Sequence, residues 1–421
     1  MIHTVKGMRD ILPPSSAVWN HVEAVCRRVF ATFNYREIRT PILEETALFS
    51  RTVGEETDIV SKEMYTFEDR DGTSLTLRPE STASVLRAYI EHRLDQQPGT
   101  QKLYYMGPMF RRERPQKGRF RQFYQIGAEA IGSDSPAIDA EVIELVLVVL
   151  QKLGIREFEL LINSVGSKES RSKYENVLRA ELKEVAPRMC EDCRRRAETN
   201  PLRVLDCKVP EDQPIISQLP SILDYLSPQD HDHFRRVRES LDDRSIPYTV
   251  EPRLVRGLDY YARTTFEITH GALGAQNAIL GGGGYDGLAE SLGAKISAPG
   301  IGFSIGEDRL VMILEEEKAV EVPPLELYIA PMGDPALRLC AVLAREIRAL
   351  DVSVEVGTER KLKRMLEIAN KMSARYTLIV GDNEILTQLY TLKDMISGEQ
   401  VTLTRQELLE QFTTNRSNIT Q

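Results

Sequence analysis

The segment from residue 111 to residue 121 carries the densest set of side chains that could bind a nucleotide. It reads RRERPQKGRFR between two runs rich in Tyr, Phe and Met, a pattern that predicts a hairpin with a long basic loop. Alternation along a strand places Arg111 and Glu113 on one face, and a guanidinium suits phosphate oxygens. Arg111 could neutralise an α-phosphate while Phe123, on the returning strand, stacks on a base. A solvated basic hairpin explains this composition equally well.

A second candidate for phosphate or adenine binding lies late in the chain. Residues 300–309 read GIGFSIGEDR, and the pattern predicts a strand at residues 300–304 followed by a helix that starts near Ile305. Arg309 falls in the first turn of that helix, where free N–H groups and the helix dipole favour anions. The two segments together favour a site for a nucleoside triphosphate.

A run of glycines offers a competing interpretation. Gly282, Gly284 and Gly287 match the spacing of a dinucleotide-binding fingerprint, which would indicate a nicotinamide-dependent oxidoreductase. The run follows a predicted strand at residues 276–280, but no strand–helix–strand unit surrounds it, and the chain lacks a Walker-type loop ending in Gly-Lys-Ser or Gly-Lys-Thr. We interpret the glycines as positions of close backbone approach to a substrate.

Three of the five cysteines have the beginning of a zinc-site spacing. Cys190 and Cys193 form a C-x-x-C pair, and Cys207 follows fourteen residues later. No fourth ligand is evident, because His231 and His233 are too distant in sequence to count. An odd number of cysteines in a chain without an export signal favours reduced thiols. We therefore expect free thiols and no bound metal.

The two nucleotide-binding candidates, with a predicted helix and strand ending at Pro41, resemble the three signature motifs of class II aminoacyl-tRNA synthetases. In that class the first motif builds the dimer interface, the second and third bind ATP, and the core is an antiparallel sheet flanked by helices. Within the class the chain most resembles the histidyl-tRNA synthetases, over essentially its whole length. The deciding segments are RGLDYY at residues 256–261 and GGGYDG at residues 282–287, which match two histidine-specific signatures.

The resemblance implies a role for each of a set of site residues. Arg256 is assigned to the α-phosphate, where related synthetases use a metal ion, and it would act with Arg111 as a catalytic residue. The implied histidine-binding residues are Glu80, Ser81, Thr82, Arg111, Gln125, Glu129, Arg256, Tyr260, Tyr261 and Tyr285. The implied ATP-binding residues are Arg111, Glu113, Arg121, Phe123 and Arg309.

The resemblance also implies a two-step ligase reaction. L-histidine would be activated with ATP and Mg²⁺ to histidyl-adenylate and then transferred to the 3′ end of tRNA(His) by a homodimer. The alternative is the non-catalytic regulatory subunit of ATP phosphoribosyltransferase, a relative that lacks the anticodon-binding domain. The chain departs from the family pattern at Gly284, which is commonly arginine, at Asp308, which is commonly glutamate, and at Ser81, which is commonly glycine.

Apolar periodicity predicts the elements that would position these residues. Valines at helical spacing predict a helix over residues 15–34, followed by a strand at 35–40. The other predicted elements are strands at 64–67 and 74–77 joined through Asp71-Gly72, a helix opening at Arg78-Pro79, a hairpin of residues 102–110 and 122–126, a helix at 136–153, an inserted helical subdomain at about 167–250 and a strand at 266–269. Neighbouring strands need no parallel crossover, so we expect an α+β fold with a mainly antiparallel sheet.

A charged and proline-bearing stretch at residues 315–324 predicts a linker between two domains, 1–320 and 325–421. Beyond it the pattern predicts a small α/β domain with strands at 325–330, 352–356 and 377–380 and helices at 335–350 and 361–373. The resemblance identifies this part as an anticodon-binding domain. Basic residues gather on its second helix, either as tRNA contacts or as an ordinary solvated face.

Composition limits the class of protein. The chain has 421 residues and a formal net charge of −9, which argues against a protein that simply coats nucleic acid. Its apolar runs are far shorter than the roughly 20 residues of a membrane-spanning helix. No secretory signal is recognisable at the start of the sequence, so we expect a cytoplasmic enzyme without a membrane segment.

Overall fold

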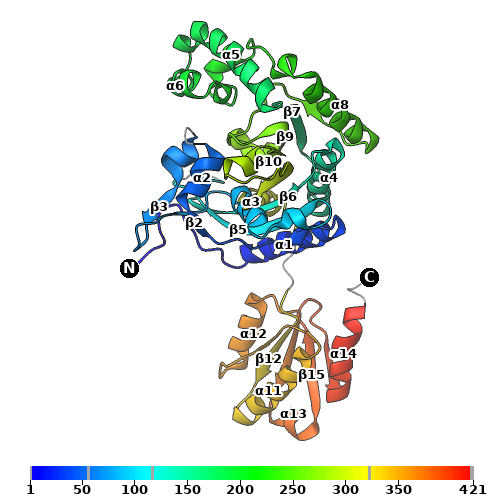
Figure 1. Ribbon diagram of the computed structural model, residues 1–421. Helices are drawn as coiled ribbons and strands as arrows, with labels where there is room; N and C mark the ends of the chain where they lie inside the picture. The colour runs from blue at the N-terminus through cyan, green and yellow to red at the C-terminus, as the bar shows by residue number, and fades with distance from the viewer. Residues whose placement is uncertain (1, 55–56, 115–117, 321–323, 418–421) are drawn as a thin grey trace. The chain divides into compact units, whose positions relative to one another are not determined.

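Two compact units make up the chain, Met1–Val320 and Glu321–Gln421 (Figure 1). The computed structural model describes residues 2–54, 57–114, 118–320 and 324–417. Each unit has its own sheet and its own hydrophobic core. Among the described residues, no helix combines the length and the apolar character that a membrane crossing requires.

An eight-stranded sheet forms the centre of the first unit, and it confirms the predicted α+β class with a mainly antiparallel sheet. The strand order is β1-β5-β6-β11-β10-β9-β7-β8. The two edge pairs, β1 with β5 and β7 with β8, are parallel, and the pairs between them are antiparallel. The strands are Arg36–Glu37 (β1), Gln101–Phe110 (β5), Gln122–Ile131 (β6), Glu159–Ser164 (β7), Thr249–Val250 (β8), Ala262–Thr269 (β9), Ala278–Gly284 (β10) and Gly300–Gly306 (β11).

The helices that pack with this sheet around the main hydrophobic core include α1 (Ser15–Thr32), α4 (Pro136–Lys152) and α10 (Glu307–Glu316). The valines whose spacing predicts α1 all lie in this core. The helix predicted at residues 136–153 is confirmed, and its apolar residues are buried on several sides. These helices hold β6 and β11 in place from one face of the sheet.

A small three-stranded sheet of order β2-β4-β3 belongs to the same unit. The predicted turn between β3 and β4 is confirmed, since Gly72 has a φ of 86° and Asp71 Oδ1 accepts a hydrogen bond from Thr73 N at 2.9 Å. The elements of this region are β2 (Leu43–Glu45), α2 (Thr46–Val53), β3 (Tyr65–Glu68), β4 (Ser74–Leu77) and α3 (Thr82–Glu91).

The start of α3 differs from the prediction, which placed it at Arg78-Pro79. The Arg78 side chain instead donates hydrogen bonds to Thr40 O and Pro108 O, at 3.0 and 3.1 Å. The helix begins at Thr82, because the Glu80 carboxylate accepts hydrogen bonds from the first free N–H groups of the helix. The strand β1 covers only Arg36–Glu37 and is therefore shorter than the predicted strand at residues 35–40.

The predicted helical subdomain between β7 and β8 is confirmed. Its helices are α5 (Lys168–Val185), α6 (Glu191–Thr199), α7 (Gln213–Ile216) and α8 (Pro228–Asp243), and Figure 1 shows them gathered beyond β7. A separate hydrophobic core joins the first part of this insertion and includes Tyr174, Leu178, Cys193 and Cys207, whereas α8 packs on α4 in the main core.

The prediction that the glycine run follows a strand is wrong, because residues 281–284 are the second half of β10 itself. They pair in antiparallel register with both β9 and β11. Glycine has a low strand propensity, so the sequence favoured a loop. A short helix, α9 (Leu288–Ser291), follows the run.

The second unit contains a five-stranded sheet of order β13-β12-β14-β15-β16. The predicted strands and helices from β12 to β14 are confirmed, whereas α13, α14 and the β15–β16 pair were not predicted. The bounds are β12 (Leu327–Pro331), α11 (Asp334–Arg348), β13 (Val354–Val356), α12 (Leu362–Lys371), β14 (Tyr376–Val380), α13 (Asp382–Thr387), β15 (Leu389–Asp394), β16 (Gln400–Thr404) and α14 (Arg405–Ser417).

Candidate active site

A cavity of about 780 Å³ lies in the first unit, over the glycine-rich strands β10 and β11. Its wall is formed by the ends of β5 and β6, the start of α3, the segment at residues 255–261 and part of the insertion. Most of the site residues expected from the sequence line it: Glu80, Thr82, Arg111, Glu113, Phe123, Gln125, Glu129, Arg256, Tyr260, Tyr261, Tyr285 and Arg309. The fold therefore brings together segments that are up to 229 residues apart in sequence.

A buried carboxyl group, that of Glu129 on β6, lies at one end of the cavity. It is 1% exposed and accepts hydrogen bonds from the hydroxyl groups of Thr82 at 2.7 Å and Tyr285 at 2.8 Å. Burial raises the pKa of Glu129 to about 8. With two hydroxyl donors already fixing its oxygens, this carboxyl is held in one orientation and can accept a further hydrogen bond from a ligand.

Close backbone approach makes room for Glu129. A Cβ atom on Gly302 of the neighbouring strand β11 would lie 1.7 Å from Glu129 Oε2. Any side chain at this position would displace the carboxylate. Position 302 therefore requires glycine because of the contact with Glu129, and not because the backbone makes a turn there.

A second buried carboxyl group, that of Glu80, faces the same end of the cavity. Its oxygens accept hydrogen bonds from Thr82 N at 2.7 Å and Ala83 N at 3.0 Å, and Tyr260 Oη lies 3.5 Å away. Burial raises the pKa of Glu80, and the two N–H groups oppose that rise. The rings of Tyr260 and Tyr261 lie 4.8 Å apart between centroids and form the wall beside it.

Three arginines, Arg111, Arg309 and Arg256, also line the cavity, and Arg256 is partly buried. Its guanidinium forms an ion pair with Glu267 on β9. Burial lowers the pKa of Arg256, but Glu267, Tyr261 and Asp206 together outweigh that effect and raise it, so the side chain stays charged. The guanidinium lies against the backbone of β10, since a Cβ atom on Gly281 would be 1.9 Å from Arg256 Nη2.

Arg111, at the end of β5, is fixed by three neighbours. Arg111 Nε donates to Pro79 O at 2.9 Å, and Arg111 Nη1 lies 3.8 Å from Glu113 Oε1. Its guanidinium carbon lies 5.2 Å from the centre of the Phe123 ring. Arg111 and Phe123 thus face the cavity from the two strands of the predicted hairpin. Of the basic loop between them, residues 115–117 lie outside the described residues.

Arg309 lies in the first turn of α10, as predicted. It donates hydrogen bonds to Ala278 O and to Gly118 O, which tie it to β10 and to the loop after β5. The neighbouring Asp308 accepts hydrogen bonds from Tyr124 N at 2.8 Å and Arg9 Nη2 at 2.9 Å. The short aspartate side chain therefore suffices to hold the start of α10 against β6.

Two residues expected at the site, Ser81 and Arg121, do not line the cavity. Ser81 is fully buried at the start of α3, with its hydroxyl 3.4 Å from Thr40 Oγ1. The Arg121 guanidinium lies 3.4 Å from Lys6 O, because the strand turns this side chain toward the N-terminal segment. Conversely, Tyr105 on β5 lines the cavity although the sequence did not single it out. The alternation of β5 places Tyr105 and Arg111 on one face, which is the signal that could have identified it.

The comparison with known families decides what kind of protein carries this cavity. The family model described as histidyl-tRNA synthetase matches residues 7–310, more than half of the chain. The chain belongs to the histidyl-tRNA synthetase family. A model described as an anticodon binding domain matches residues 326–415 of the second unit.

Individual members of the histidyl-tRNA synthetase family match over nearly the whole chain. A histidine–tRNA ligase of Solibacter usitatus is 67% identical over 408 residues, which cover 97% of this chain and 98% of the relative. A histidine–tRNA ligase of Koribacter versatilis is 54% identical over 420 residues, which cover 97% of this chain and 95% of the relative. The crystal structure of the apo histidyl-tRNA synthetase of S. aureus superimposes with a TM-score of 0.82 at 38% identity and covers 98% of this chain and 100% of that chain.

Membership of the histidyl-tRNA synthetase family confirms the resemblance and the enzyme class. The oxidoreductase interpretation is wrong, because the glycine run lies in an antiparallel strand instead of a strand–helix–strand unit. The regulatory-subunit alternative is disfavoured, because residues 326–415 match the anticodon-binding model.

Proposed function

We propose that this chain activates L-histidine with ATP to histidyl-adenylate and transfers the histidyl group to the 3′ end of tRNA(His). The observation that carries the proposal is the lining of one cavity, which combines the buried carboxyl groups of Glu80 and Glu129 with the partly buried guanidinium groups of Arg111, Arg256 and Arg309. Such a cavity suits a substrate pair in which one molecule has an amine and an imidazole and the other has a triphosphate.

Glu129 is the residue that would recognise the imidazole by a hydrogen bond. Its carboxylate can accept a hydrogen bond from a ring N–H, and the Tyr261 hydroxyl beside it can serve the second ring nitrogen. The Glu80 carboxylate would hold the amino group, with Thr82, Gln125, Tyr260 and Tyr285 completing the pocket. An amino acid that lacks the imidazole would leave Glu129 buried without its partner, which is the physical basis for selecting histidine.

Arg256 would act where charge develops during adenylate formation. The histidine carboxylate oxygen attacks the α-phosphorus, a new P–O bond forms, and the bond to the β-phosphate oxygen breaks to release pyrophosphate. Arg256 is fixed by Glu267 and by the backbone at Gly281, so its positive charge needs no rearrangement as the oxygens become more negative. Arg111 and Arg309 would neutralise the phosphates, and Phe123 would support the adenine.

Two carboxylates that line the cavity are suited to bind magnesium. Glu113 and Glu267 line it and are oxygen ligands of the kind that Mg²⁺ takes beside a triphosphate. When bound, the ion would offset the charge of the phosphates. Glu113 also orients Arg111 and Arg119, at 3.8 and 2.9 Å, and so links the basic loop to the cavity.

The second unit would contact the anticodon end of the tRNA. Exposed basic residues on and around α12 supply charges for phosphate contacts: Arg360, Lys361, Lys363, Arg364 and Lys371. A homodimer and a cytoplasmic location belong to the same proposal, since the first signature motif, represented here by α1 and β1, builds the dimer interface in the class II family.

Amino-acid-dependent exchange of pyrophosphate into ATP tests the proposal. The assay is run with the full chain, Mg²⁺ and each amino acid in turn. We expect exchange with histidine alone, followed by histidine incorporation into tRNA(His) in the second step. No exchange with any amino acid would contradict the proposal and would revive the non-catalytic alternative.

A further inference from the structure

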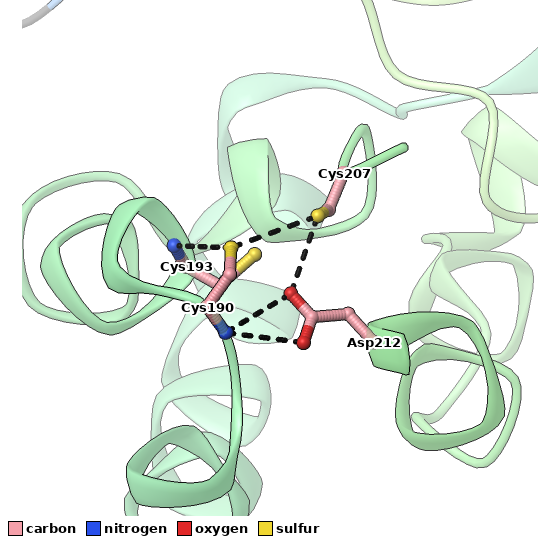
Figure 2. A group of neighbouring side chains, drawn as sticks. All are labelled: Cys190, Cys193, Cys207 and Asp212. Atoms are coloured by element: carbon pink, nitrogen blue, oxygen red, sulfur yellow. Dashed lines mark hydrogen bonds between the residues drawn. The ribbon is translucent and has the colours of Figure 1, made fainter. Parts of the chain in front are cut away.

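Four potential metal ligands of the insertion converge on one point, although the sequence indicated three of them (Figure 2). The Sγ atoms of Cys190, Cys193 and Cys207 and a carboxylate oxygen of Asp212 all lie within 4.8 Å of one another. Cys193, Cys207 and Asp212 are buried, and Cys190 is half-buried. Asp212 supplies the fourth ligand that the spacing of the cysteines did not reveal.

Two of the distances between these atoms are close to those of a tetrahedral zinc site. Zinc bonds of about 2.3 Å to sulfur and about 2.0 Å to oxygen place two sulfur ligands about 3.8 Å apart and a sulfur and an oxygen about 3.5 Å apart. The observed separations are 3.9 Å between the Sγ atoms of Cys190 and Cys207 and 3.3 Å between Cys207 Sγ and Asp212 Oδ2. A disulfide needs sulfur atoms about 2.0 Å apart, which this arrangement does not provide.

The backbone around the cluster favours thiolates. Cys190 caps the start of α6, and its Sγ accepts a hydrogen bond from Cys193 N at 3.4 Å. Val209 N donates in the same way to Cys207 Sγ, also at 3.4 Å. The N-terminus of a helix and N–H donors stabilise negative sulfur. These hydrogen bonds form the outer shell that orients zinc ligands.

Asp212 is oriented for ligation by the same backbone. Its Oδ1 accepts a hydrogen bond from Cys190 N at 3.1 Å, while its Oδ2 faces the sulfur of Cys207. A carboxylate that is 2% exposed and surrounded by thiols has an unbalanced charge unless a cation joins it. We propose that Cys190, Cys193, Cys207 and Asp212 bind one structural Zn²⁺ ion.

Zinc binding at this site is coupled to proton release. Zinc displaces the proton of each thiol as three Zn–S bonds and one Zn–O bond form, and the protons leave to solvent. The complex has a net double negative charge, which the adjacent basic residues 194–196 and Lys208 offset in part.

The ion would stabilise the wall of the active-site cavity. Cys190 and Cys207 line the cavity themselves, and the core of the insertion contains Cys193, Cys207 and Val255. Val255 directly precedes Arg256. A closed site with four protein ligands leaves no position for a substrate, so the ion has a structural role and not a catalytic one.

Metal analysis of the untagged full-length chain tests this inference. The protein is purified without chelator, incubated with ZnCl₂, passed through gel filtration and analysed by elemental mass spectrometry. Cys193→Ser is the test variant, and Cys340→Ser, which changes a buried cysteine of the second unit, is its matched control. We expect about one zinc per chain in the wild type and in the control, and almost none in Cys193→Ser.

A second measurement, on the wild type alone, tests the metal site if Cys193→Ser fails to fold. The wild type is stripped with a chelator and loaded with CoCl₂ alone. A thiolate-to-cobalt charge-transfer band with the intense visible bands of tetrahedral cobalt supports the site. A wild type that retains no zinc and gives only the weak spectrum of six-coordinate cobalt overturns the proposal, as does a disulfide among these cysteines in the intact mass.

Discussion

The absence of a side chain at Gly281 allows a direct test of the position of Arg256. In Gly281→Ala the new Cβ atom would lie 1.9 Å from Arg256 Nη2, whereas real Cβ contacts keep at least 3.0 Å, so the guanidinium must move by about 1.1 Å. The colliding group is the end of a flexible side chain, and the backbone need not shift. We therefore expect a loss of catalysis without a loss of the fold.

The expected size of the effect follows from that displacement. Misplacing a catalytic group by about 1 Å costs about 100-fold in rate. The free energy of unfolding should change by less than about 1 kcal/mol, because alanine also lowers the entropy of the unfolded chain. Histidine-dependent pyrophosphate exchange measures the first quantity, and urea unfolding measures the second.

Gly271→Ala is the matched control, since a Cβ atom on Gly271 meets nothing within 4 Å and the residue does not line the cavity. It should exchange pyrophosphate at the wild-type rate. If Gly281→Ala also does so while remaining folded, Arg256 does not act from the position described, and the reasoning is refuted.

Two further predictions concern buried carboxyl groups. The pKa of Glu129 is raised from 4.5 to about 8 in the folded protein, so between these pH values the folded protein binds more protons than the unfolded chain and its stability falls as pH rises. Glu129→Gln should therefore reduce the pH dependence of the unfolding free energy measured in urea, and it should raise the KM for histidine. An unchanged pH dependence in Glu129→Gln would contradict this prediction. Glu307 is fully buried on α10, with neither oxygen hydrogen-bonded among the described residues, and burial raises its pKa to about 8. Glu307→Leu should therefore add about 1–3 kcal/mol to the unfolding free energy, with the larger gain above pH 8 than below it, and a destabilised variant would contradict this.

Periodicity and motif spacing predicted the parts of the molecule in which local sequence and tertiary packing agree. The valines of α1 all enter the core, and the hairpin that bears Arg111 and Phe123 forms as expected. In these segments one face is buried along the whole element, so the spacing of apolar residues indicates whether the segment is a helix or a strand.

The predicted strand at residues 276–280 covers the first half of β10, but its continuation through the glycines at 281–284 could not be predicted in this way. A glycine is unfavourable in a strand by its own propensity, and the compensation comes from distant residues. Gly281 makes room for Arg256, and Gly302 on β11 makes room for Glu129. These contacts join positions far apart in sequence, so neither the continuation of the strand through its glycines nor the reason for those glycines is visible locally.

The same limit applies to Asp212. It lies at the end of a short 3₁₀ segment, Pro210–Asp212, and nothing in its neighbourhood in the sequence marks it as a partner of Cys190. The insertion folds around a core that brings the two chain segments together. The fourth ligand of the proposed zinc site therefore became apparent only in three dimensions.

The role of Arg256 is the central claim, and one measurement tests it most directly. Adenylate formation is followed in a single turnover with histidine and ATP, for the wild type and for Arg256→Ala. Removing one preorganised charge partner should lower the rate about 10²- to 10³-fold while the fold is retained. Adenylate formation at a near-normal rate in Arg256→Ala would contradict the account.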